Sequence, residues 1–288
     1  MKPRVLMAVS PQLRQEIFGE DALHRLKSFA SPSYHPGPGD MAAEDLARTI
    51  PRFDGLITGW GSPTITPEIV AKARRLRIIS HSAGSVRPFI CDEVFGKGIC
   101  VTNASSAIAL SVAETTIALI IGSLRHLFEY DDHLRRLREE KPEFGASHEL
   151  TGRTVGIVGM GEVGKRVIAL LKPFSCRILV YDPYKPKGEI ERAGGLPVAL
   201  EDLMAESDVV SIHAPNIPAN RHMISRDMLA KLRDGALLVN TARGELIDEE
   251  SLIREAGSGR IRCALDVFEA DAHSVARKLR GVGGVILT

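Results

Sequence analysis

The sequence predicts an α/β protein built from two doubly wound parallel sheets. Short apolar runs alternate with amphipathic stretches, this alternation occurs in both halves of the chain, and a glycine-rich turn separates one strand from the helix after it. With 288 residues, of which 44% are hydrophobic and 25% charged, the chain is long enough for two domains, each with its own core.

The charge balance favours small-molecule partners. The chain has 37 basic and 36 acidic residues and a net charge of +1, so no overall field attracts nucleic acid or an anionic membrane. The apolar run at residues 5–9 is too short for a signal-peptide core, and no uninterrupted apolar stretch approaches the roughly 18 residues of a membrane span. We therefore expect a cytoplasmic protein that binds neither nucleic acid nor membrane.

The four cysteines, Cys91, Cys100, Cys176 and Cys263, are scattered along the chain. Their spacing is not that of a zinc site or a redox dithiol. We expect reduced core residues and no metal site.

The first domain is expected to contain four strands, at residues 5–9, 54–60, 77–82 and 99–103. Amphipathic stretches at 23–29 and 67–76 predict helices between them. Three prolines and two glycines within residues 32–39 predict a loop.

A long helical segment is predicted over residues 105–140, with Ser105 or Ser106 as its N-cap. The first half of this segment is apolar on most faces, which indicates burial. Two interpretations remain open, a core helix between the domains and a helix that packs against a second subunit.

The second half of the chain predicts a further strand and helix series. We expect domain boundaries at 1–102 and 103–288. The predicted strands lie at residues 154–159, 177–182, 208–214, 236–242, 262–268 and 284–288.

The glycine-rich turn is the strongest local signal. Gly159, Gly161 and Gly164 form G-x-G-x-x-G directly after an apolar strand and directly before a helix. The first glycine permits the tight turn, the second lets the backbone approach a pyrophosphate, and the third allows helix and strand to pack closely. The motif predicts a dinucleotide site, against the alternative of a purely structural turn.

The next strand ends in Asp182, about 20 residues further on, where a carboxylate accepts hydrogen bonds from the adenosine ribose. A carboxylate there would repel a 2′-phosphate, which predicts NAD rather than NADP. Lys185, which follows Asp182 closely, is the one observation against the prediction of NAD rather than NADP.

Ligands of an open parallel sheet collect at the carboxyl ends of its strands. In this sequence those ends carry polar residues that would converge on one crevice. They are Asp182, His213, Arg243, Asp266, Glu269 and Asp271.

The blocks "GIVGMGEVGKRV", "VYDP", "HAPNIPANRHMI", "LLVNTARGELIDEESL" and "ALDVF" occur in the order and near the spacing of one known family. With them the chain resembles the D-isomer-specific 2-hydroxyacid dehydrogenases over nearly its whole length. The resemblance implies a Rossmann NAD-binding domain, a flavodoxin-like substrate domain and a homodimer. It implies a cofactor site made of Gly159, Met160, Gly161, Glu162, Val163, Gly164, Asp182, His213, Ala214, Pro215, Thr241, Ala242 and Asp266.

The family's catalytic groups are an Arg, an acid and a His. The resemblance assigns the Arg to Arg243, which would hold the substrate carboxylate and polarise the 2-oxo group. The acid falls on Asp271, with Ala272 in place of the usual proline, and Glu269 is a second candidate.

The family's proton-donating His follows the last strand, which here is the run before Thr288. We expect a further segment that supplies this His and covers apolar surface of the first domain. An alternative is that His273 serves as the proton donor instead. A catalytically inactive NAD(H)-binding sensor or scaffold, or a fragmentary product without activity, are the alternatives to an enzyme.

The resemblance places two loops of the first domain beside the substrate. Trp60 and Gly61 stand in one loop, and Ala83, Gly84 and Ser85 in the other, although simple turns would explain the glycines equally well. Family members that bind phosphorylated substrates tend to carry a basic residue near the first loop. Trp60 and Ser62 stand here instead, so the resemblance implies an unphosphorylated substrate.

The leading prediction is an NAD-dependent oxidoreductase that interconverts a 2-oxo acid and a D-2-hydroxy acid by hydride transfer. The sequence identifies neither the individual substrate nor the physiological direction, and it gives no role to Arg87.

Overall fold

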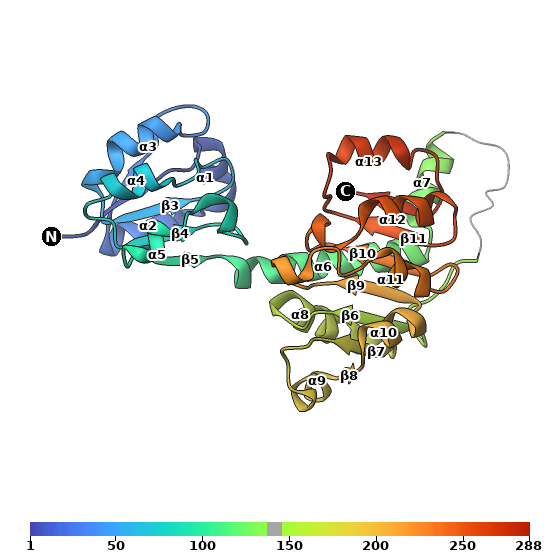
Figure 1. Ribbon diagram of the computed structural model, residues 1–288. Coiled ribbons are helices and arrows are strands. Elements are labelled where there is room, and N and C mark those ends of the chain that lie inside the picture. Colours follow the sequence, from blue (N-terminus) through green and yellow to red (C-terminus); the bar gives the residue numbers. More distant parts are fainter. Residues whose placement is uncertain (137–145) are drawn as a thin grey trace. The chain divides into compact units, whose positions relative to one another are not determined.

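The computed structural model describes residues 1–136 and 146–288, which divide into two compact units, Met1–Ile108 and Ala109–Thr288. Each unit is an α/β structure around one parallel sheet (Figure 1). The fold class predicted from the sequence is confirmed.

The first unit has a five-stranded parallel sheet in the order β2-β1-β3-β4-β5. This order matches the flavodoxin-like arrangement, in which the switch point lies between β1 and β3. The strands are β1 (Arg4–Met7), β2 (Ser31–Tyr34), β3 (Gly55–Thr58), β4 (Ile78–His81) and β5 (Cys100–Asn103). The helices are α1 (Pro11–Ile17), α2 (Glu20–Phe29), α3 (Ala43–Thr49), α4 (Pro67–Lys72) and α5 (Glu93–Gly96).

Strand β2 corrects the prediction of a loop at residues 32–39. The strand begins at Ser31 and includes Pro32, which the edge position of β2 tolerates because one side of an edge strand needs no hydrogen-bond donor. The loop itself follows β2.

The second unit has a seven-stranded parallel sheet in the order β12-β11-β10-β9-β6-β7-β8 (Figure 1). The central strands β6, β9 and β10 are almost entirely buried, as expected for a parallel sheet covered on both faces. The strands are β6 (Thr154–Val158), β7 (Arg177–Tyr181), β8 (Leu196–Pro197), β9 (Val209–Ile212), β10 (Leu237–Asn240), β11 (Arg262–Leu265) and β12 (Val285–Leu287).

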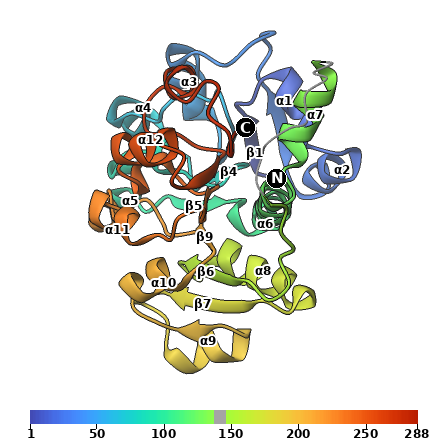
Figure 2. The same ribbon diagram turned by 90° about the vertical axis from the view of Figure 1, so that its right-hand side faces the viewer.

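Two apolar clusters form the core of this unit. One contains α6 and α8 residues such as Ile120 and Ile168, and the other contains α10 to α12 residues such as Leu203 and Leu252. The helices are α6 (Ser105–Leu124), α7 (Leu127–Arg135), α8 (Glu162–Leu171), α9 (Lys187–Ala193), α10 (Leu200–Glu206), α11 (Arg226–Lys231), α12 (Glu249–Gly257) and α13 (Ala272–Lys278). Figure 2 shows α8 and α9 near the β6–β7 side of the sheet.

The single helix predicted over 105–140 is instead two helices, α6 and α7. His126, with φ of 53°, adopts a left-handed conformation between them, which ends the α-helical ladder. Helix α6 begins at Ser105, as predicted, but the predicted serine cap differs, because Asn103 Oδ1 accepts a hydrogen bond from the Ser105 amide at 3.1 Å. Residues 137–140 of the prediction lie outside the described residues.

Within the described residues, α6 is long and apolar enough to cross a membrane by length and composition, with a mean hydropathy of 1.9 over its most apolar window. The sequence expectation concerned uninterrupted apolar stretches, and α6 is interrupted by Ser111, Glu114, Thr115 and Thr116. A core helix passes the same test, and α6 contributes Ala113, Leu119, Ile120 and Leu124 to one core cluster of the second unit.

The expectation that all four cysteines are core residues was wrong in part. Cys263 is buried, but Cys100 is exposed, and Cys91 and Cys176 are half-buried.

Candidate functional site

The carboxyl ends of the second sheet bring the predicted cofactor residues to one edge. Strand β6 leads into the glycine turn, β7 into Asp182 and β9 into His213. Strand β10 leads into Thr241 and Arg243, and β11 into Asp266. Because all seven strands are parallel, these ends lie along the same edge of the sheet.

Each of the three positions in the turn is occupied by glycine for a different structural reason. Gly159 has φ of 95°, and a Cβ there would lie 2.8 Å from the backbone nitrogen of Ala214. A Cβ at Gly164 would overlap the carbonyl oxygen of Gly159, so close packing of α8 on β6 requires glycine. A Cβ at Gly161 would meet no atom within 4 Å, which leaves its backbone open to a ligand.

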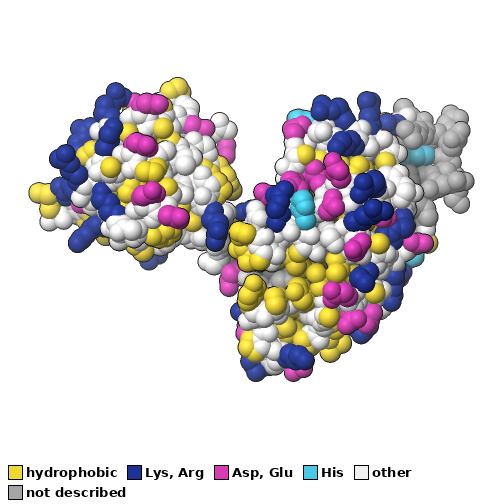
Figure 3. Space-filling model, viewed as in Figure 1, with side chains coloured by type: hydrophobic (Ala, Val, Ile, Leu, Met, Phe, Trp, Pro, Cys, Tyr) yellow, Lys and Arg dark blue, Asp and Glu magenta, His cyan; other side chains and the backbone are white. Residues whose placement is uncertain are grey.

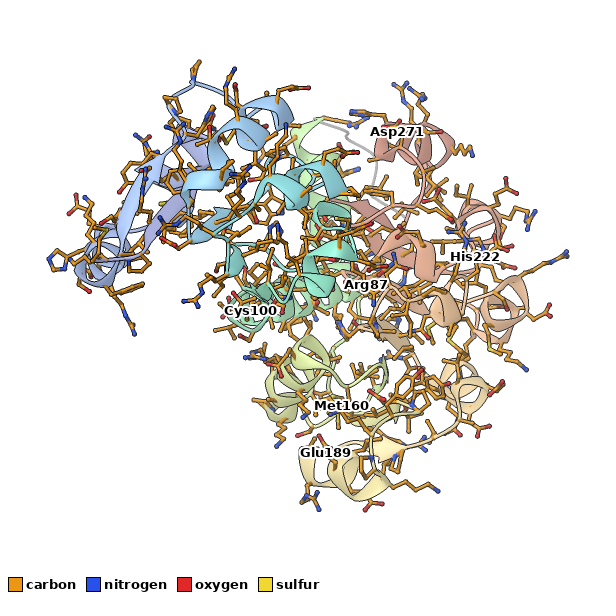
Figure 4. The ribbon with its side chains drawn as sticks, turned by 60° about the vertical axis from the view of Figure 1, so that its left-hand side comes forward. Arg87, Cys100, Met160, Glu189, His222 and Asp271 are labelled. Carbon is orange, nitrogen blue, oxygen red and sulfur yellow. The ribbon has the colours of Figure 1, made fainter. Side chains whose placement is uncertain are left out.

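Asp182 is tied to the glycine turn. Its Oδ2 accepts a hydrogen bond from the Met160 amide at 2.8 Å, and its Oδ1 accepts one from the Tyr184 amide at 2.9 Å. Met160 itself is fully buried and lies at the start of the turn into α8 (Figure 4). These hydrogen bonds fix the Asp182 carboxylate next to the glycine turn.

A small hollow opens beside this carboxylate. The residues that line it come from the ends of β6, β7 and β9 and from the segments that follow them. They are Val158, Gly159, Tyr181, Asp182, Pro183, Tyr184, Ala214, Pro215, Asn220 and Met223. Figure 3 shows apolar side chains exposed on the visible face of this unit. Apolar walls, one carboxylate and an open glycine backbone fit the adenosine and pyrophosphate of NAD.

His213 is held neutral at the end of β9. Its Nε2 lies 2.9 Å from Ser211 Oγ, and burial lowers the pKa of His213 to about 3. The imidazole therefore carries no charge near neutral pH and is a packing and hydrogen-bonding group in this site.

The loop after β10 carries the predicted Arg. Asn240 shapes the loop, because its Nδ2 donates to the Arg243 carbonyl at 2.8 Å and its Oδ1 accepts from the Ala242 amide at 3.0 Å. Thr241 Oγ1 lies 2.9 Å from Thr116 Oγ1, which joins the loop to α6. The Arg243 side chain is exposed and donates only to the neighbouring Ala242 carbonyl among described groups.

The two candidate acids are in different environments. Glu269 Oε2 accepts a hydrogen bond from His222 Nε2 at 2.7 Å, and its other oxygen pairs with Arg221. Asp271 is exposed and caps α13, with Oδ2 accepting from the Ser274 amide at 2.9 Å. Figure 4 labels Asp271 and also His222, the partner of Glu269.

Glu249 was missed as a site residue. Its Oε2 accepts a hydrogen bond from the Glu269 amide at 2.9 Å, and its Oε1 accepts one from the Ala270 amide at 3.2 Å. A Cβ at Gly244 would also overlap the backbone of Phe268. The loop that carries Arg243 is therefore packed directly against residues 268–271 after β11, which we call the acidic loop.

His222 and Arg221 were also missed, although both lie in a block that the sequence singled out. His222 has φ of 50°, a left-handed conformation that directs its amide to the Glu245 carbonyl at 2.9 Å. A non-glycine residue in this conformation is a signal that only the structure reveals.

Asp266, at the end of β11, accepts a hydrogen bond at Oδ1 from Thr288 Oγ1 at 3.1 Å. Glu162 opens α8, and its carboxylate pairs with Arg166 at 2.8 Å. Val163 packs against the α8 core cluster.

The first unit carries the predicted substrate loops at the carboxyl ends of β3 and β4. Trp60 is 55% exposed, and Gly61 has φ of 75° with the Asp40 carboxylate packed over it. Ala83 is buried, and its carbonyl accepts from the Ala104 amide at 3.1 Å. A Cβ at Gly84 would meet no atom within 4 Å, and Ser85 is half-buried.

His81 is a structural residue of the first unit. Its Nδ1 lies 2.9 Å from Thr58 Oγ1, its ring packs on Phe89, and burial lowers its pKa. Arg87 begins a short 3-10 turn, and nothing in the structure explains its role. Across residues 1–136 and 146–288, no group of three or more His, Cys, Asp or Glu side chains could hold a metal ion.

A seven-stranded parallel sheet with this glycine turn, carboxylate and hollow defines a Rossmann-type nucleotide-binding domain. Residues 117–288 match the family described as D-isomer specific 2-hydroxyacid dehydrogenase, NAD binding domain. The chain belongs to the D-isomer specific 2-hydroxyacid dehydrogenase family, and it is an NAD-dependent oxidoreductase.

Individual relatives support this assignment. The chain is 35% identical over 254 residues to hydroxypyruvate reductase of Thermotoga maritima, covering 86% of this chain and 80% of that protein. It is 36% identical over 298 residues to glyoxylate reductase of Aeropyrum pernix, covering 99% and 85%. It is 33% identical to D-3-phosphoglycerate dehydrogenase of Methanocaldococcus jannaschii but spans only 48% of that protein.

Solved structures agree with the fold. The D-lactate dehydrogenase of Aquifex aeolicus, complexed with NAD and lactic acid, has a TM-score of 0.79 at 26% identity, covering 99% of this chain and 87% of that one. The reaction is thus the interconversion of a 2-oxo acid and a D-2-hydroxy acid, and the comparisons give no support to an inactive NAD(H)-binding protein.

Proposed function

We propose that this enzyme reduces a small, unphosphorylated 2-oxo acid of the hydroxypyruvate and glyoxylate class with NADH. The observation that carries the proposal is the exposed Arg243 guanidinium, on a loop that begins at the same sheet edge as the glycine turn. A planar guanidinium can hold a carboxylate and polarise the neighbouring 2-oxo group.

The substrate class follows from the first unit. Trp60 and the Asp40 carboxylate stand at the loop after β3, and neither offers a positive charge to a phosphate group. The relatives that reduce hydroxypyruvate and glyoxylate support the same class. The phosphoglycerate dehydrogenases are the competing assignment.

NAD(H), when bound, supplies or accepts the hydride. The glycine turn and the α8 N-terminus would hold the pyrophosphate, and Asp182 would hold the adenosine ribose. The neutral His213, with Ala214 and Pro215, would line the cofactor pocket. The full proposed set also includes Met160, Glu162, Val163, Thr241, Ala242 and Asp266.

Asp271 is the proposed acid, and Glu269 is the residue that anchors its loop. Both Glu269 oxygens are engaged by Arg221 and His222, whereas Asp271 Oδ1 has no partner among the described residues. In the family pattern, an acid at this position keeps the proton-donating imidazole charged. The substrate loops proposed for the first unit are Trp60–Gly61 and Ala83–Ser85, and we retain 1–102 as the substrate domain and 103–288 as the NAD-binding domain.

We also infer a cytoplasmic homodimer that binds no nucleic acid or membrane. The resemblance and the exposed apolar residues Leu127, Phe128 and Leu134 of α7 support self-association, which a concentration series in sedimentation tests.

The decisive experiment follows NADH oxidation with glyoxylate, hydroxypyruvate, pyruvate and 3-phosphohydroxypyruvate. We expect kcat/KM to be highest for one of the first two. Turnover that is most efficient with 3-phosphohydroxypyruvate would refute the substrate class, and no turnover with any of the four would refute the proposed function.

A further inference from the structure

Two lysines, one just after the glycine turn and one just after Asp182 in the chain, share one carboxylate. Lys165 Nζ, on α8, lies 2.8 Å from Glu189 Oε1 on α9. Lys185 Nζ, in the turn after β7, lies 3.4 Å from the same oxygen. Figure 4 marks Glu189 on α9. The Glu189 and Lys185 side chains are each 32% exposed and Lys165 is 42% exposed, so all three are accessible to a ligand.

This cluster lies close in the chain to the proposed ribose carboxylate. Asp182 directly follows β7, and its Oδ1 accepts from the Tyr184 amide, so the chain turns immediately before Lys185. Tyr184 and Asp182 both line the hollow. Lys185 is therefore the first cation after the ribose position, and Glu189 is its counter-ion.

A 2′-phosphate adds a charge of nearly −2 at the ribose, so a protein that binds NADP must supply free cations there. The cations of α8 are already engaged, because Arg166 pairs with Glu162 at 2.8 Å and Lys165 pairs with Glu189. Lys187, at the start of α9, makes no ion pair among the described residues. The net positive charge that Lys165 and Lys185 offer to a 2′-phosphate therefore depends on whether the Glu189 carboxylate is ionised and paired with them.

We propose that Glu189 is a cofactor-specificity residue, which disfavours NADP(H) by neutralising Lys165 and Lys185. NAD(H) is unaffected because its ribose has free hydroxyls, which donate to Asp182. This inference rests on the proposed cofactor site and deepens it. It assigns the discrimination between NAD(H) and NADP(H) to a second carboxylate besides Asp182. Glu189 acts by pairing with the two lysines, and it does not contact the ribose.

The test compares the Kd values of NADH and NADPH in the wild type and in Glu189→Gln at low ionic strength. We expect NADPH to bind roughly five- to tenfold more tightly to Glu189→Gln, a gain limited by solvent screening, while the Kd of NADH stays within about twofold. The gain should shrink at high salt, as for any partly exposed charge pair.

Glu191→Gln is the matched control, since it removes the same charge from the same helix and Glu191 makes no ion pair among the described residues. Two combined variants locate the effect. Adding Lys165→Met and Lys185→Met together to Glu189→Gln should abolish the NADPH gain, whereas adding Lys187→Met should preserve it. Thermal melting confirms that each variant is folded.

Unchanged NADPH affinity in Glu189→Gln, or an equal gain in Glu191→Gln, would overturn the role of Glu189 while leaving the cofactor site intact. A wild-type protein that binds neither dinucleotide would overturn the cofactor site, and this inference with it.

Discussion

His222 Nε2 lies 2.7 Å from Glu269 Oε2, which connects the loop after β9 to the acidic loop after β11. Arg221 pairs with the other oxygen of the same carboxylate, and Glu249 accepts from the Glu269 amide. The acidic loop is thus held from its side chain and from its backbone. Because Gly244 packs on Phe268, this restraint extends to the loop that carries Arg243.

Glu269→Gln should reduce kcat with the 2-oxo acid by roughly tenfold, because the acidic loop loses its ion pair and with it the geometry of the reacting groups. NADH affinity should be unchanged, which fluorescence titration can check. Glu255→Gln is the control, since it removes a similarly buried carboxylate from its pair with Arg260 elsewhere in the unit. Equal losses of activity in the two variants would contradict a positioning role.

Arg243→Ala should lower kcat/KM by two orders of magnitude or more, since the substrate loses the group that binds its carboxylate and polarises its carbonyl. The Kd of NADH should stay unchanged, because Arg243 makes no contact with the glycine turn or the hollow among the described residues. Steady-state kinetics and titration give both values. Activity within a few-fold of wild type would remove Arg243 from the reaction.

Gly161→Ala and Gly164→Ala should separate cofactor binding from folding. Alanine at 161 meets open space, so stability should be retained while the methyl group obstructs the pyrophosphate and weakens NADH binding. Alanine at 164 collides with the Gly159 carbonyl and should cost about 1–3 kcal/mol of unfolding free energy. Denaturant unfolding and NADH titration distinguish the two, and similar stability losses would contradict this distinction.

His213 should make stability depend on pH. Burial lowers its pKa from 6.5 to about 3, so the unfolded chain binds a proton that the folded chain excludes. Stability from this group is complete above pH 6.5 and is lost as the pH falls toward 3, by up to about 1.4 kcal/mol per pH unit. His213→Gln should remove that slope, with exposed His273→Gln as the control. Equal slopes in the two variants would contradict the buried neutral state.

The fold was predictable because its signals are local and periodic. Buried strands such as β6 and β9 are largely apolar runs, and the glycine turn is marked by glycines at three fixed positions. Strand β2 was not predictable, because Pro32 opposes a strand until the edge position is known. The break between α6 and α7 depends on a left-handed His126, a conformation that composition does not reveal.

The candidate site shows the same division. The sequence by itself determined the fold class and the glycine turn, because strand runs and glycine spacing are local signals. It also singled out Asp182 as a candidate by its place at the end of a strand and Arg243 by the family block in which it stands. Only the tertiary structure decided that Glu269 is bound by Arg221 and His222, that Glu249 holds the acidic loop and that Glu189 neutralises two lysines. Except for the Lys185 contact, these pairs join residues at least 20 positions apart, and such contacts form only when the loops of a folded sheet come together.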